Sequence, residues 1–121
     1  MGIITILYIA NATLLLLHEI ESAYEKEWDI LKLPGGVTGF LMMHIPIIFV
    51  ILYGLLEITK QTFMGFVWGI ILGIGGIIPF VVHKIIVKRD NHFNLLVSNV
   101  IIYTNVLIGI SLSILATIAI I

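Results

Sequence analysis

Four long apolar segments constrain this chain more than any other feature of its sequence. They cover about residues 3–17, 37–58, 63–87 and 92–121, and most ionisable residues lie between them. Each segment is close to the ~20 residues that an α-helix needs to cross a bilayer. Hydrophobic residues make up 60% of the chain and charged residues only 11%, which is far from the composition of soluble domains. The sequence therefore predicts an integral membrane protein.

Short connections between these segments predict an all-α fold, a four-transmembrane-helix bundle with up-down-up-down topology. The expected helices of this single domain, residues 1–121, cover about residues 3–31, 37–58, 63–88 and 92–121. Pro34 followed by two glycines ends the first helix, because proline cannot continue a helix. Pro79 is expected to kink the third helix.

The basic residues predict the orientation of the bundle. Of the six lysines and arginines, all but Lys60 lie beside the first and third connections. By the positive-inside rule these two connections are cytoplasmic and both termini lie outside. The net charge is −1, and the sequence has no basic stripe that could neutralise phosphates. Both observations argue against nucleic acid as a partner. Membrane lipid is the expected surrounding.

The stretch from Leu17 to Trp28 combines a histidine with four carboxylates at the edge of the first apolar segment. Ionisable groups in this position are costly and mark a functional site. The chain has four histidines, one on each predicted helix near the predicted cytoplasmic side, and no cysteine. Histidine and carboxylate ligands suit zinc, iron or manganese, and helical bundles hold metals between such side chains. The sequence therefore predicts a divalent-metal site.

The candidate residues of this site follow from helical periodicity. Asn11, His18, Glu21 and Glu25 share one face of the first helix, whereas Glu19 projects about 100° away. On the fourth helix, His92, Asn99 and Tyr103 likewise share one face. The predicted metal ligands are His18, Glu21, His44, His83 and His92. The predicted catalytic acid–base residues are Glu21 and Glu19, and the groups expected to orient the ligands are Glu25, Asn99 and Tyr103.

Other interpretations of these residues remain open. His92 suits a helix cap, and His83 suits the basic edge formed with Lys84. For Glu27, next to Lys26, a solvated helical extension is the favoured interpretation. The start of the H-E-x-x-H zinc signature at His18 is not completed, since position 22 is serine. A haem held by two histidines is also open.

Several short motifs resemble a small uncharacterised family of four-helix prokaryotic membrane proteins, similar in style to the HXXEE-type families. These motifs are His18-Glu19-Ile20-Glu21, Glu27-Trp28, His44-Ile45-Pro46, His83, and Asn91-His92-Phe93 with Ser98. The resemblance covers nearly the whole chain, although Glu21 stands where aspartate is expected more often. It implies that the histidines and glutamates form one site in a prokaryotic cytoplasmic membrane, and it implies no reaction.

The leading hypothesis is a divalent-metal-dependent membrane enzyme, a hydrolase or oxidase, that acts on a lipid or another apolar substrate. The alternatives are a small transporter or channel and a non-catalytic membrane subunit. Proton-coupled transport would require a carboxylate in mid-membrane, and Glu57 lies near the outer end of its helix. Gly65, Gly69 and Gly73 recur every four residues, which favours close packing inside the bundle and leaves a homo-oligomer through this face as a second interpretation.

Overall fold

The computed structural model describes residues 2–87 and 95–121, which are helical apart from short turns. Its elements are α1 (Ile3–Tyr24), α2 (Glu27–Ile30), α3 (Gly36–Thr59), α4 (Phe63–Gly75), α5 (Ile78–Phe80), the π-helix η1 (Val81–Ile86) and α6 (Leu96–Ile120). No strand occurs in the described ranges. The predicted all-α fold is confirmed.

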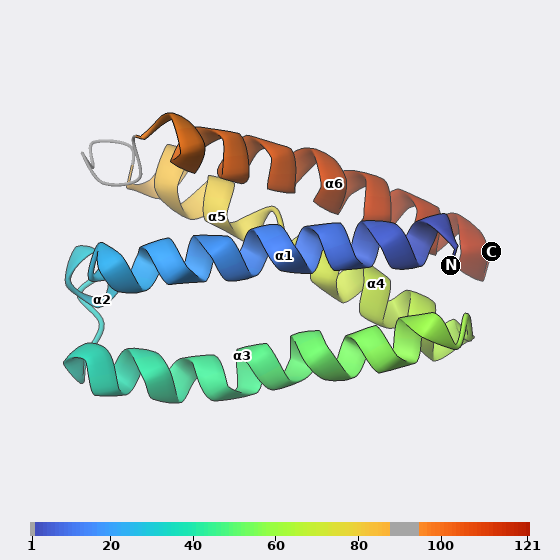
Figure 1. Ribbon diagram of the computed structural model, residues 1–121, viewed down its shortest axis with the longest axis horizontal. Coiled ribbons are helices and arrows are strands. Elements are labelled where there is room, and N and C mark those ends of the chain that lie inside the picture. Colours follow the sequence, from blue (N-terminus) through green and yellow to red (C-terminus); the bar gives the residue numbers. More distant parts are fainter. Residues whose placement is uncertain (1, 88–94) are drawn as a thin grey trace.

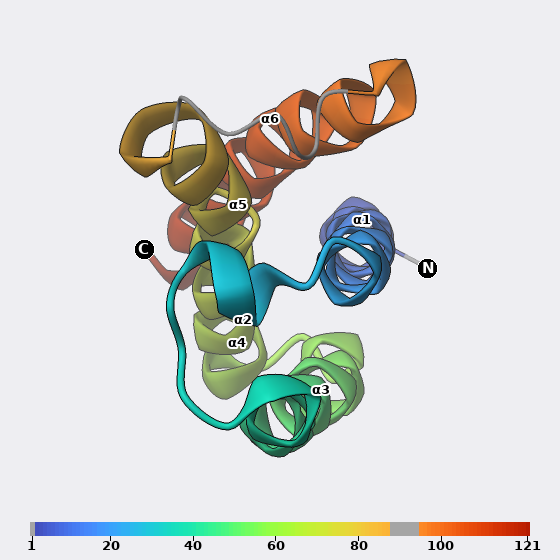
Figure 2. The same ribbon diagram turned by 90° about the vertical axis from the view of Figure 1, so that its left-hand side faces the viewer.

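The helices α1 and α4 lie in the middle of the bundle, between α3 and α6. Both of these helices contact α3 on one side and α6 on the other. Figure 1 shows both chain termini at one end of the bundle and α2 at the opposite end. Seen from that opposite end, α2 lies across the space bounded by α1, α3 and α4 (Figure 2). The short helix α2 therefore covers one end of the bundle interior.

Within the described residues, four helical segments are long and apolar enough to cross a membrane. They are Ile3–Tyr24, Gly36–Thr59, Phe63–Ile86 and Leu96–Ile120. No more than 33% of the most apolar window of any of them is buried inside the chain, and large side chains such as Phe49 and Leu107 are exposed. In water such a surface would favour aggregation, whereas lipid tails solvate it well. These segments imply an integral membrane protein in contact with lipid.

Glycines allow α4 to approach its neighbours closely. Gly65, Gly69 and Gly73 are all buried in α4. A Cβ atom at Gly73 would lie 2.7 Å from the backbone oxygen of Gly109 in α6, so only glycine permits this helix crossing. The glycine face is occupied by contacts within one chain. A homo-oligomer through this face stays a prediction that this packing does not support.

Two predicted helices are interrupted. The first ends at Tyr24 rather than near residue 31, because Lys26 adopts a left-handed backbone conformation with φ 54° and starts α2 in a new direction. The third is broken between Gly75 and Ile78, close to Pro79, which cannot donate a backbone hydrogen bond to the preceding turn. Residues 92–94 of the predicted fourth helix lie outside the described ranges.

A buried asparagine faces the break in the third span. The Asn11 side chain is fully buried in α1, and its Nδ2 donates a hydrogen bond of 2.7 Å to the Leu72 carbonyl oxygen of α4. A Cβ atom at Gly76 would collide with Asn11 Oδ1, so the glycine makes room for the amide. This contact ties α1 to α4 in the middle of the bundle.

Replacing Asn11 with alanine is expected to lower the free energy of unfolding by about 1 kcal/mol, because the Leu72 carbonyl loses its side-chain donor. Reversible unfolding in mixed micelles measures this change. Thr13→Ala is the matched control, since the Thr13 hydroxyl bonds only to Ile9 of its own helix at an exposed position. Equal stability of the two variants would contradict a structural role for Asn11.

Candidate metal centre

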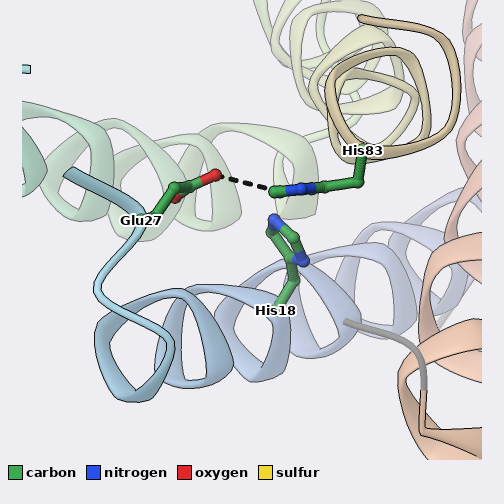
Figure 3. Close-up of side chains that lie close together, drawn as sticks. All are labelled: His18, Glu27 and His83. Carbon is green, nitrogen blue, oxygen red and sulfur yellow. Dashed lines mark hydrogen bonds and ion pairs between the residues drawn. The ribbon is translucent and has the colours of Figure 1, made fainter. Parts of the chain in front are cut away.

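His18, Glu27 and His83 come together from three separate elements. His18 lies on α1, Glu27 opens α2, and His83 lies in η1. One potential ligand atom from each residue lies within 4.8 Å of the others. Figure 3 shows the His18 ring and the Glu27 carboxylate both directed toward the His83 ring. We refer to these three residues as the His–Glu–His cluster.

The cluster is shielded from solvent, and a hydrogen bond joins two of its three members. His83 Nε2 donates to Glu27 Oε1 over 3.0 Å, and the rings of His18 and His83 lie 5.1 Å apart with an interplanar angle of 61°. His18 Nε2 lies 3.3 Å from the hydroxyl of Ser22, one turn further along α1. His18 and His83 are 3% and 6% exposed, and the Glu27 side chain is 12% exposed. Two imidazoles and one carboxylate thus converge in a largely buried space.

Local backbone features direct these side chains inward. The left-handed Lys26 ends the path of α1, so Glu27 returns over the end of the bundle instead of continuing along the first helix. His83 lies in a π-helix, and π-helical turns change the direction of side chains and frequently occur at functional sites. Both irregular segments therefore direct a side chain, Glu27 or His83, into the cluster.

The Glu27 carboxyl group is held in its charged form. Burial by itself would raise its pKa, but the hydrogen bond and charge of His83, together with a hydrogen bond from Ser22, outweigh this effect and lower the pKa below its ordinary value. Glu27 is therefore ionised at neutral pH. An ionised carboxylate is the form that ligates a metal ion.

Glu19 and His44 form a second, partly buried pair next to the cluster. Glu19 Oε2 lies 2.5 Å from His44 Nε2, and His44 Nδ1 donates to the Phe40 carbonyl oxygen over 2.7 Å. A carbonyl oxygen only accepts, so Nδ1 carries a hydrogen, and the His44 ring lies between the Phe40 backbone and the Glu19 carboxyl group. His44 therefore links Glu19 of α1 to the backbone of α3.

A cavity of about 390 Å³ connects these groups. His18, Glu27 and His83 line it, and so does Glu19. The remaining walls are mostly apolar and belong to α1, α3, α4, α5 and η1. The polar groups are thus accessible to a molecule that occupies the cavity.

The structure distributes the other predicted site residues over different contacts. Glu21 accepts a hydrogen bond from Ser98 of α6, so it does not join His18 as the helical stripe predicted. Asn99 Oδ1 accepts from Lys84 Nζ over 2.5 Å, and the half-exposed Tyr103 ring lies near the same ammonium group. Glu25 is half-buried at the end of α1, and His92 lies outside the described residues.

Glu27 is the residue that sequence reasoning missed. Its interpretation as part of a solvated extension is wrong, since the side chain is largely buried and bonded to His83. His44, expected as a ligand, instead pairs with Glu19, which was expected on another face. The only signal that singled out Glu27 was the Glu27-Trp28 motif in the resemblance.

Comparison with known proteins places the chain in a family. A family model described as a family of unknown function, DUF6713, matches residues 4–119. The chain belongs to this family. The match confirms the expected membership of an uncharacterised family and extends over every element described above. No curated protein and no solved structure matches the chain.

Proposed function

We propose that this protein is a membrane hydrolase that depends on a divalent metal, bound by His18, Glu27 and His83. The observation that carries the proposal is the convergence of two buried imidazoles and an ionised carboxylate within 4.8 Å. Two histidines and one glutamate are the protein ligands of several catalytic zinc sites, in which water takes a further position. This ligand set replaces the one predicted from helical periodicity.

The surroundings of the cluster also support a catalytic site rather than a closed structural one. The described residues supply three protein ligands, one fewer than the four of a structural zinc site. The cluster lines a cavity instead of being sealed by packing. Ser22, which lies near His18 Nε2 and bonds to Glu27, holds two of the candidate ligands in position. A substrate in the cavity would therefore reach the metal.

Glu19 is the proposed acid–base residue for hydrolysis. A bound divalent metal would lower the pKa of a ligated water molecule to about 7. Glu19 would accept a proton from this water molecule while the water oxygen forms a bond to the carbonyl carbon of an ester substrate. The carbon–oxygen bond to the leaving alcohol would then break, and Glu19 would pass the proton to the alcohol oxygen. His44 would keep the Glu19 carboxyl group in place through their 2.5 Å contact.

An oxidative iron enzyme is the second candidate, since the same observation favours it. Two histidines and one carboxylate with open positions are also the ligands of non-haem iron(II) oxygenases. Glu19, a carboxyl group that lines the same cavity, favours hydrolysis as the first candidate, because hydrolysis needs a residue that moves a proton. The identity of the metal separates the two reactions.

Elemental analysis of the purified protein tests the metal site. We expect about one equivalent of zinc per chain in the wild type, and loss of this metal in His18→Ala, His83→Ala and Glu27→Gln. The affinity should fall by more than about 100-fold, because even residues that only support ligands are worth 10–100-fold. Iron in place of zinc would select the oxidative candidate.

His44→Ala is the matched control for this experiment. It also removes a buried histidine, but one that contacts Glu19 and Phe40 and is not part of the cluster. We expect it to keep its metal. No metal in the wild type after reconstitution with zinc, iron or manganese would contradict the proposed function. Loss of metal in His44→Ala alone would contradict the proposed ligand set.

A further inference from the structure

The cavity beside the His–Glu–His cluster has its polar groups at one end. His18, Glu19, Glu27 and His83 line the part near α2, whereas the opposite part is lined by Tyr8 and Trp68, which meet beside Gly54. Tyr8 precedes His18 by ten residues on α1, which corresponds to about 15 Å along a helix. The cavity is therefore elongated, with a polar head and an apolar body.

The apolar body offers few polar groups to a ligand. Its walls include Leu15, Val50, Leu72 and Val82. The hydroxyl of Tyr8, at the far end, donates to the Ile51 carbonyl oxygen over 2.7 Å and is thereby occupied. Ligand cavities of 300–1,000 Å³ with apolar walls and few polar groups are typical of small-molecule sites, and this one has about 390 Å³.

The cavity opens toward the surrounding lipid between α3 and the third span. Ile47 of α3, Ile71 of α4 and Ile78 of α5 line the cavity and are also 40%, 47% and 55% exposed on the surface. The break near Gly76 contributes to this opening. Before the break α4 contacts both α3 and α6, whereas after it α5 contacts α6 (Figure 1). An apolar molecule can thus enter sideways from the membrane.

We propose that this cavity binds a single acyl chain and that the substrate of the proposed hydrolase is a fatty-acyl ester. The chain would lie along the apolar body with its end near Trp68, and the ester group would lie beside Glu19 and the cluster. A length of about 15 Å and a volume of about 390 Å³ suit one acyl chain rather than both acyl chains of a two-chain lipid. This assignment rests on the proposed function for the reaction, but chain binding can be measured without it.

Trp68 provides a direct probe of the cavity. In a Trp28→Phe background Trp68 is the only tryptophan, because the chain has two. Laurate brominated at its terminal carbon should quench Trp68 fluorescence in phosphatidylcholine nanodiscs, and the quenching should saturate. Laurate brominated next to its carboxyl group should quench much less, because that bromine would lie near the cluster. Equal quenching by both compounds would overturn the proposed orientation.

Two variants of α3 show whether the bound chain occupies the cavity. Val50→Phe fills the apolar body, and we expect it to weaken laurate binding at least about tenfold, a loss equivalent to ~1.4 kcal/mol. Leu52→Phe adds a similar ring at a position that is 55% exposed and does not line the cavity, and it should bind like the wild type. Quenching that does not saturate and is the same in both variants would overturn the proposal.

The metal content of the same samples separates this proposal from the proposed function. Val50→Phe should keep its metal, because the side chain is not part of the cluster. Bound metal without saturable laurate binding would overturn the acyl-chain proposal alone. Saturable laurate binding in a wild type that never holds metal would overturn the hydrolase and leave a lipid-binding protein.

Discussion

Replacing Glu19 with glutamine is expected to slow hydrolysis of a chromogenic lauric ester by about 10²–10⁴-fold while the bound metal stays at the wild-type level. Glutamine keeps the size of the side chain and a hydrogen-bonding group for His44, but it cannot accept a proton from water. The turnover rate in nanodiscs and the metal content of the same sample measure the two quantities.

Glu21→Gln is the control for this variant. Glu21 lies two residues away on the same helix, accepts a hydrogen bond from Ser98 of α6 and does not line the cavity. The sequence alone marked both glutamates as catalytic candidates, whereas only Glu19 lines the cavity. We therefore expect the wild-type rate for Glu21→Gln. Similar losses in both variants, or a loss of metal in Glu19→Gln, would contradict the role proposed for Glu19.

Replacing Gly73 with alanine is expected to destabilise the bundle by about 1–3 kcal/mol. The added Cβ atom would lie 2.7 Å from the Gly109 backbone oxygen and would collide with the Ser113 side chain, so α4 and α6 would have to separate. A backbone oxygen cannot rotate away as a flexible side chain does. The midpoint of thermal unfolding in detergent should fall accordingly.

Gly75→Ala provides the matched comparison on the same helix. A Cβ atom at Gly75 would meet only Leu15 Cδ1, at 3.7 Å, which is an ordinary contact. Because alanine is about 1 kcal/mol more favourable than glycine within a helix, this variant should be as stable as the wild type or more stable. Equal destabilisation of both variants would show that the α4–α6 crossing is not as close as the structure has it.

The helical fold was predictable because it depends on two local properties of the sequence. The length of the apolar segments fixes the spans, and the four-residue spacing of Gly65, Gly69 and Gly73 indicates close packing. The break near Pro79 also follows from local chemistry. The turn at Lys26 did not, because a lysine in a left-handed conformation has no signature in the sequence.

The site was only partly predictable because α1 has neighbours on several sides. His18 faces His83 of the third span, Glu19 faces His44 of α3, and Glu21 faces Ser98 of α6. Helical periodicity separates Glu19 from His18 and Glu21 by angle, but it cannot tell which neighbour lies at each angle. The predicted polar stripe therefore combined residues that belong to different contacts.

The placement of Glu27 on α2 has a consequence for the unliganded protein. The three candidate ligands come from positions 18, 27 and 83, and α2 is only four residues long. A bound ion would therefore act as a cross-link that fastens the first connection to two membrane-spanning helices. Binding at 100 times the dissociation constant stabilises a folded state by about 2.7 kcal/mol. Chelation would then loosen α2 first, the segment that covers the cavity. The same metal would therefore both take part in the reaction and keep the cavity closed.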